Sequence, residues 1–153
     1  NFIFSSQLTT KYLTSKMKSY LPVLFILSLF FSCTNHGTHL DVDGDEMYYQ
    51  APVTEATALA VAGYLKKDQF FIGGGAKAQI LMDSMYTINL AFEEKYNPGT
   101  DEIIGYQFML LDMSNALFEG KPININLCDN NFKPFHNISF TEATSALESL
   151  MYK

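Results

Sequence analysis

The sequence contains no arginine and no tryptophan, and all ten of its basic residues are lysines. Three of those lysines precede Cys33, so the chain from Cys33 onward has seven lysines against sixteen acidic residues, a formal net charge of −9. An acidic surface without guanidinium groups repels phosphate backbones and lacks the bidentate donors that bind them. We therefore expect no nucleic-acid partner, and no direct adsorption to anionic lipid through basic side chains.

The sequence also lacks the patterns of common catalytic and cofactor sites. It has two cysteines, and of its three histidines only His136 lies in the same half of the chain as Cys128. A nucleophilic cysteine needs a neighbouring base, and no spacing brings these two together, so we expect Cys128 to be a half-buried, inert thiol. The triplet Gly73–Gly75 lacks the lysine and hydroxyl of a phosphate-binding loop and is interpreted as a hinge. We predict no catalytic residue, no cofactor and no metal.

Residues 17–33 follow the order of an export signal. Positive charge flanks Met17, an uncharged apolar run of 11 residues covers 21–31, and Cys33 follows it. A run of that length is typical of a signal peptide and is too short to cross a bilayer of about 30 Å as a helix. We expect Met17 to be the natural start and residues 1–16 to be an upstream extension of the reading frame. An uncleaved anchor and an ordinary secretory signal are the alternatives.

The segment 29–33, Leu-Phe-Phe-Ser-Cys, resembles the lipobox that lipoprotein signal peptidase recognises. Ser32 is a typical small residue before the cysteine, while Phe30 replaces the usual leucine, valine or isoleucine, and such aromatic boxes resemble those of Bacteroidetes lipoproteins. The resemblance implies that residues 17–32 are removed and that Cys33 is lipidated. The expected partner is then the inner or outer membrane of a Gram-negative cell envelope, held by several acyl chains because one alone binds only marginally.

Residues 33–52 are interpreted as a solvated tether, because they have no apolar periodicity and four acids between positions 41 and 46. Two sharper interpretations exist. His36 and His39, followed by these acids, are metal-ligand types at close spacing. The acids also resemble a calcium loop, although the glycine stands at the fourth position instead of the sixth and Pro52 replaces the closing glutamate.

We expect a single domain over residues 53–153, mainly α, with a small bundle of four helices and one short β element. Apolar periodicity and capping signals place these elements: helices at 54–67, 76–96, 101–119 and 141–151, and a strand at 123–127 that could pair with 69–72. The segment 129–137 is expected to be a loop. The alternative is an α+β fold with a central antiparallel meander, because apolar residues between Ile104 and Leu110 also alternate.

Two of the expected helices share a start. Thr-Glu-Ala-Thr occurs at 54–57 and again at 141–144, which we ascribe to common capping chemistry, with a threonine as N-cap in each. The helix over 101–119 carries an apolar stripe and is expected to be central; its members are Ile103, Tyr106, Leu110, Met113 and Leu117.

Three functions compete. The leading hypothesis is a non-enzymatic lipoprotein that binds another envelope protein, for example as an immunity protein or inhibitor, with its acidic surface speeding encounter with a basic partner. The second is a small-ligand-binding lipoprotein with an aromatic-lined cavity. The third is an enzyme that uses His136 or Cys128, which would require convergent polar groups around them. The sequence leaves the oligomeric state open.

Overall fold

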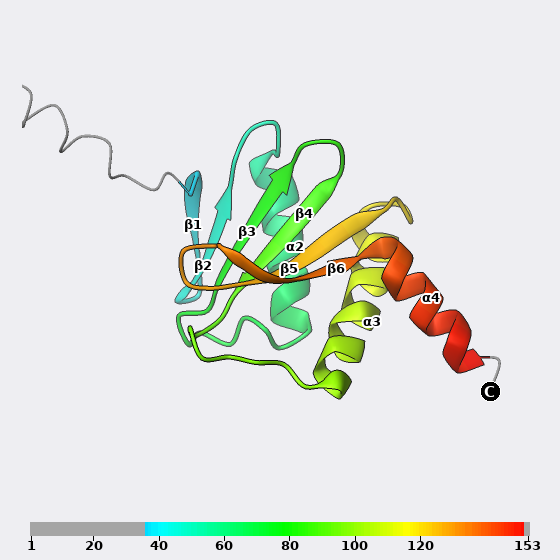
Figure 1. Cartoon of the computed structure of the whole chain (residues 1–153). Helices are drawn as coiled ribbons and strands as arrows, with labels where there is room; N and C mark the ends of the chain where they lie inside the picture. The colour runs from blue at the N-terminus through cyan, green and yellow to red at the C-terminus, as the bar shows by residue number, and fades with distance from the viewer. Residues whose placement is uncertain (1–35, 152–153) are drawn as a thin grey trace, which may run out of the picture. The chain divides into compact units, whose positions relative to one another are not determined.

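The computed structural model describes residues 36–151, which form one compact unit (Figure 1). A six-stranded mixed sheet and three helices make up this part of the chain. Their bounds are β1 (Thr38–Val42), β2 (Asp45–Tyr49), α2 (Glu55–Lys67), β3 (Lys77–Met82), β4 (Tyr86–Ala91), α3 (Thr100–Leu117), β5 (Ile123–Cys128), β6 (Pro134–Ser139) and α4 (Phe140–Met151). The fold is α+β, so the expectation of a mainly α bundle of four helices is wrong.

The strands lie in the sheet in chain order, and a hairpin followed by a helix occurs three times. Each hairpin is antiparallel, whereas β2 pairs with β3 and β4 pairs with β5 in parallel. Parallel neighbours need a long crossover, and α2 and α3 supply the two crossovers. Such crossovers are almost always right-handed, so both helices pack on one face of the sheet, behind it in Figure 1.

One face of the sheet forms the core against these helices. Alternate strand residues contribute to it because strand side chains point to opposite faces in turn. Its fully buried strand members are Met47, Ala78, Ile80, Ile88, Leu90, Ile123, Ile125, Leu127 and Ile138, and the helices add Ala58, Val61, Leu65, Leu110 and Met113. The alternation of Ile123, Ile125 and Leu127 predicted the strand correctly, although its partners are β4 and β6 and not residues 69–72.

The opposite face of the sheet carries a row of amide side chains. Gln79, Asn89, Asn126 and Asn137 are paired neighbours on β3, β4, β5 and β6. Each side-chain nitrogen donates to the next oxygen: Asn137 to Asn126 at 2.6 Å, Asn126 to Asn89 at 2.8 Å and Asn89 to Gln79 at 2.8 Å. Gln79 then donates to the carbonyl of His36 at 2.8 Å. Because Gln79 and Asn89 are buried, these bonds satisfy groups that would otherwise destabilise the sheet.

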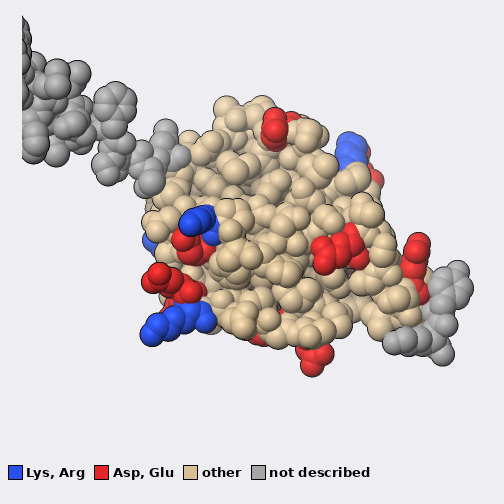
Figure 2. Space-filling model, viewed as in Figure 1, with Lys and Arg blue, Asp and Glu red and all other residues tan. Residues whose placement is uncertain are grey.

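The β5–β6 loop folds over part of this amide row. Asp129 shapes the loop by accepting hydrogen bonds from the backbone N–H groups of Asn131 and Lys133 at 2.8 and 3.0 Å. Phe132 extends over this same face of the sheet toward β2, where its ring centroid lies 5.6 Å from that of Tyr48. Figure 2 shows this side of the molecule, where charged side chains gather mainly toward the margin.

The segment 76–96, expected to be a helix, is the β3–β4 hairpin. Ala78 and Ile80 on one strand, and Ile88 and Leu90 on the other, alternate into the core. Ala78 and Ile88 also fit the three- and four-residue spacing of a helix, and residues 83–85 connect the two strands. The residue pattern alone fits both the helical period and the strand period. Pairing with β2 and β5 on either side selects the strands, because it satisfies the backbone groups of β3 and β4.

The segment expected to be a solvated tether, 33–52, contains the first hairpin of the sheet. Asp43 and Gly44 both have positive φ, 57° and 91°, which is the conformation that a two-residue hairpin turn requires and that Asp-Gly sequences favour. Met47 and Asp45 on β2 are buried. The described residues of this segment therefore belong to the domain, which begins at His36 and not at residue 53.

The other three helices were predicted correctly in position. Thr54 caps α2, as expected, by accepting a hydrogen bond from the backbone N–H of Thr57 at 3.2 Å. The common-capping explanation for the repeated tetrapeptide is wrong, because Ser139 and not Thr141 caps α4, accepting from the N–H of Glu142 at 3.2 Å. Both tetrapeptides nevertheless stand where a hairpin passes into its helix. Within residues 36–151, no helix is long and apolar enough to cross a membrane.

Substitutions in α3 test this fold. Leu110 is fully buried, so Leu110→Ala should lower the free energy of unfolding by about 2–5 kcal/mol. Gly105 lies on the same helix, and a Cβ added there meets nothing within 4 Å, so Gly105→Ala should be neutral or stabilising by up to about 1 kcal/mol. Urea denaturation of the two variants checks both values. A harmless Leu110→Ala, or a strongly destabilising Gly105→Ala, would contradict the placement of α3.

Candidate functional site: an acidic cleft between α2 and α3

Cys33, the predicted lipidation site, lies outside the described residues. Cys128 is fully buried at the end of β5, where its thiol lies 3.7 Å from the carbonyl oxygen of Asn126. Burial, followed by the negative charge of Asp129, raises the pKa of the Cys128 thiol to about 12. A thiol that stays protonated is a poor nucleophile.

The histidines do not complete a catalytic or metal centre. Nε2 of His136 is buried and has no hydrogen-bond partner among the described residues, so neither an acid nor a thiol is bonded to this nitrogen. His36 and His39 pack against Tyr48 with ring centroids 5.9 and 5.1 Å away. No group of three histidine, cysteine or acidic side chains between residues 36 and 151 is placed to hold a metal ion.

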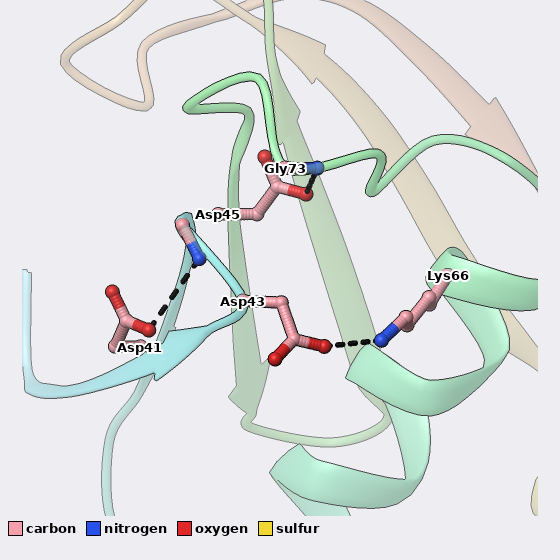
Figure 3. Close-up of polar contacts among 6 residues, drawn as sticks. Asp41, Asp43, Asp45, Lys66 and Gly73 are labelled. Atoms are coloured by element: carbon pink, nitrogen blue, oxygen red, sulfur yellow. Dashed lines mark hydrogen bonds and ion pairs between the residues drawn. The ribbon is translucent and has the colours of Figure 1, made fainter.

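The acids that resembled a calcium loop bind three different partners (Figure 3). Oδ1 of Asp41 accepts from the N–H of Gly44 at 3.4 Å, and Asp43 forms an ion pair with Lys66 of α2. Asp45 points the other way, into the loop before β3. Calcium needs several oxygen ligands that converge on one point, and these three carboxylates diverge.

Asp45 explains the glycine triplet, which is not a hinge. Its carboxylate is buried and accepts from the backbone N–H groups of Gly73 at 2.7 Å and Ala76 at 2.9 Å. Burial alone would raise the pKa of Asp45, but the backbone N–H groups of residues 73–76 outweigh it and the pKa is lowered. Gly73 and Gly75 have φ of 78° and 80°, a conformation that glycine adopts without steric cost. The loop is therefore a backbone cradle for one carboxylate.

The candidate site is an open cleft of about 470 Å³ where the C-terminal end of α2 meets the first half of α3. Asp68, Gln69 and Phe70 form one wall, just after α2 ends. The other wall comes from successive turns of α3: Glu102, Gly105, Tyr106 and Met109. The lining combines two carboxylates with apolar and aromatic surface, and none of its residues is a lysine. A concave surface with a few polar groups among apolar ones is the usual form of a binding site.

Hydrogen bonds fix the α3 wall of the cleft. Oε2 of Glu102 accepts from the backbone N–H of Gly99 at 2.7 Å, and Oε1 accepts from the hydroxyl of Tyr96 at 3.2 Å. The hydroxyl of Tyr106 lies 3.2 Å from that of Tyr96. The Tyr96 ring in turn stacks on Phe92, with centroids 4.2 Å apart. The carboxylate of Glu102 and the ring of Tyr106 are thus oriented before anything binds.

Two of the groups that line the cleft have shifted pKa values. Burial, and then repulsion from Asp112, raises the pKa of Asp68, and the positive charge of Lys67 offsets part of this rise. The pKa of Tyr106 is raised by burial first, then by the Tyr96 hydroxyl, with further contributions from Glu102 and Asp68. Burial is the largest cause of both shifts, and burial disfavours charge of either sign in the cleft.

Sequence reasoning missed this cleft. Tyr106 was assigned to the core stripe of its helix, and it is half-buried at the cleft instead. Asp68 directly follows the predicted helix 54–67, and no motif marks it as part of a site. Gly105 has no side chain on a helix face where its neighbours have large ones. This gap was the one sign of the cleft that the sequence offered. The position of the α2–β3 connection against α3 depends on tertiary packing that no local pattern shows.

These features define an α+β domain of three hairpin–helix units with a single mixed sheet. Residues 39–139 match the model of the AF_1994_N family, which is described as a family N-terminal domain, and the chain belongs to this family. The match starts within β1 and ends with β6, so it includes the whole sheet apart from Thr38. No curated protein and no solved structure matches the chain.

The Asp45 cradle gives a prediction with a pH signature. Asp45→Asn removes the charge that the N–H groups bind, and should cost about 1–3 kcal/mol of unfolding free energy near pH 7. Because the folded pKa lies below the ordinary 3.8, the contribution is complete above that pH and is lost as the pH falls through the folded value. The difference between wild type and variant should therefore shrink below about pH 4.

Urea denaturation between pH 2.5 and 7 measures this difference. Asp41→Asn is the matched control, because Asp41 lies on the same hairpin but is exposed, and a change within about 0.5 kcal/mol is expected for it. A difference between wild type and Asp45→Asn that stays constant over the whole pH range would contradict the cradle.

Proposed function

We propose that this chain is a lipid-anchored binding domain of the bacterial cell envelope, which holds a partner protein in the cleft between α2 and α3 and catalyses no reaction. The observation that carries the binding role is the cleft itself, with a fixed carboxylate and a fixed tyrosine on one wall and a second carboxylate opposite. Pre-oriented groups bind without a further ordering cost.

The overall charge supports a basic partner. The chain from Cys33 onward has a formal net charge of −9, and long-range attraction between oppositely charged proteins speeds their encounter. The cleft is open to solvent, which suits a protruding side chain of a protein better than a small molecule that has to be enclosed.

The anchor in this proposal rests on the order of residues 17–33, with positive charge, an apolar run, Ser32 and Cys33. Two residues separate Cys33 from His36, the first residue of the domain. A chain covers at most about 3.6 Å per residue, so a lipid on Cys33 would hold the domain close to the bilayer without a long tether.

Metabolic labelling tests the anchor. Cells that express the wild-type chain or Cys128→Ser with labelled palmitate should incorporate label into the protein, which should pellet with the membranes. Cys33→Ser should lose the label, because the thiol is the acylated atom. Cys128→Ser is the matched control, as these are the chain's two cysteines. Label that persists in Cys33→Ser would contradict the anchor.

A further inference from the structure

Helix α4 repeats the apolar pattern of α2 but not its burial. Counted from the capping residues Thr54 and Ser139, both helices carry apolar residues at the fourth, seventh, eighth and eleventh positions. In α2 these residues are all buried: Ala58, Val61, Ala62 and Leu65. In α4 the burial falls off along the helix, from a buried Ala143 through half-buried Ala146 and Leu147 to Leu150, which is 49% exposed.

The strands beneath the two helices account for this difference. α2 connects β2 to its parallel neighbour β3 and therefore lies over a pair of strands. α4 follows β6 in the same way, but among the described strands β6 has no neighbour on its outer side. Figure 1 shows α4 beyond β6, at this edge of the sheet. The pattern of α4 is thus that of a helix that covers a strand beside β6, as α2 covers β3 beside β2.

The outer edge of β6 lacks most of the features that prevent pairing. Native edge strands are commonly protected by charged side chains, proline or bulges. Pro134 and a bulge in the pairing with β5 stand at the start of β6, but residues 135–139, Phe-His-Asn-Ile-Ser, include neither an acid nor a lysine. An extended peptide that adds a strand to such an edge is a common mode of recognition.

Two side chains of β6 have an atom without a hydrogen-bond partner among residues 36–151. Asn137 donates to Asn126 at the end of the amide row, and its own Oδ1 accepts no hydrogen bond there. Nε2 of His136 is buried without a partner, although buried polar atoms are normally hydrogen-bonded. Because neighbouring strand residues point to opposite faces, these two atoms lie on the two sides of the same open edge.

We propose that β6 and α4 bind an extended segment of a partner protein, which pairs with β6 in parallel and packs against the exposed apolar side of α4. Its residues that face α4 are apolar, and the residue beside Asn137 is a hydrogen-bond donor. Positive charge in the segment suits the site, because α4 presents Glu142 and Glu148 to solvent. The inference goes beyond the proposed function and does not depend on the cleft between α2 and α3.

The sequence of β3 supplies a probe, because β3 occupies the equivalent place beside β2. Ala78 and Ile80 face the core, Gln79 lies in the amide row, and Lys77 adds a positive charge. The probe is the N-acetyl amide of the peptide Lys-Ala-Gln-Ile-Leu-Met. A peptide of the same composition in scrambled order, without the alternation of apolar residues, is its control.

Titration of the full chain, labelled with ¹⁵N and held in a neutral detergent, tests the inference. The β3 peptide should shift the amide resonances of residues 135–139 and 143–150 in a saturable way, and the scrambled peptide should bind at least about tenfold more weakly. A nitroxide at the N-terminus of the β3 peptide should broaden the resonance of Phe135 more than that of Ser139, because the strands are parallel.

Leu150→Lys locates the binding. It should weaken the peptide by about fivefold or more, because it places a charge on the apolar side of α4. Leu59→Lys on α2 is the matched control, since Leu59 and Leu150 are both 49% exposed, and it should bind as wild type does. Thermal melts verify that both variants are folded.

Four results would overturn the inference. They are no saturable shift with the β3 peptide, equal binding of the scrambled peptide, stronger broadening at Ser139 than at Phe135, and unchanged binding by Leu150→Lys. Shifts at residues 135–139 that depend on the concentration of the chain alone would show that a second copy covers the edge, and would also contradict a partner of a different kind.

Discussion

The carboxylate of Asp45, bound by backbone N–H groups of the loop at residues 73–76, is the interaction on which the rest of the structure depends. It joins β2 to the connection between α2 and β3, which are far apart in sequence. Directly beside it, the N–H of Glu46 donates to the carbonyl of Ala76 at 2.8 Å, where the parallel pairing of β2 and β3 begins. A buried carboxylate without such donors would be strongly unfavourable, so the loop and the strand require each other.

The same connection also builds the cleft. Residues 68–76 leave α2, turn back and enter β3, and the N–H groups of Phe70 and Phe71 donate to the carbonyl of Leu65 at 2.9 and 3.1 Å. Asp45 therefore fixes the far end of the segment whose first residues, Asp68 to Phe70, form one wall of the cleft. The hydrogen bonds of Glu102 and Tyr96 fix the other wall. The carboxylate of Asp45 is thus satisfied by the backbone of this connection, whereas Asp68 and Glu102 line the cleft.

Much of the helical structure could be predicted from sequence, and much of the sheet could not. Thr54 and the pattern around Leu110 are local signals, and α2 and α3 lie where these signals placed them. The β3–β4 hairpin was mistaken for a helix because Ala78 and Ile88 satisfy both periods, and only the pairing with distant strands selects one. The first hairpin was missed because Asp45 seemed one more solvated acid, when its charge is satisfied by backbone groups about thirty residues away.

The site was harder to predict than the fold. Neither a motif nor a spacing joins Asp68 to Glu102, since α2 and α3 come together only through tertiary packing. The amide row could not be predicted from the sequence either, because Gln79, Asn89 and Asn126 become neighbours only through the register of the paired strands. Hydrogen exchange at the Gly73 and Ala76 amides tests the central role of Asp45 most directly. These two protons should exchange far more slowly than in an unstructured peptide. Exchange at the unstructured rate, with Ile88 and Leu90 still protected, would show that the carboxylate does not hold the loop.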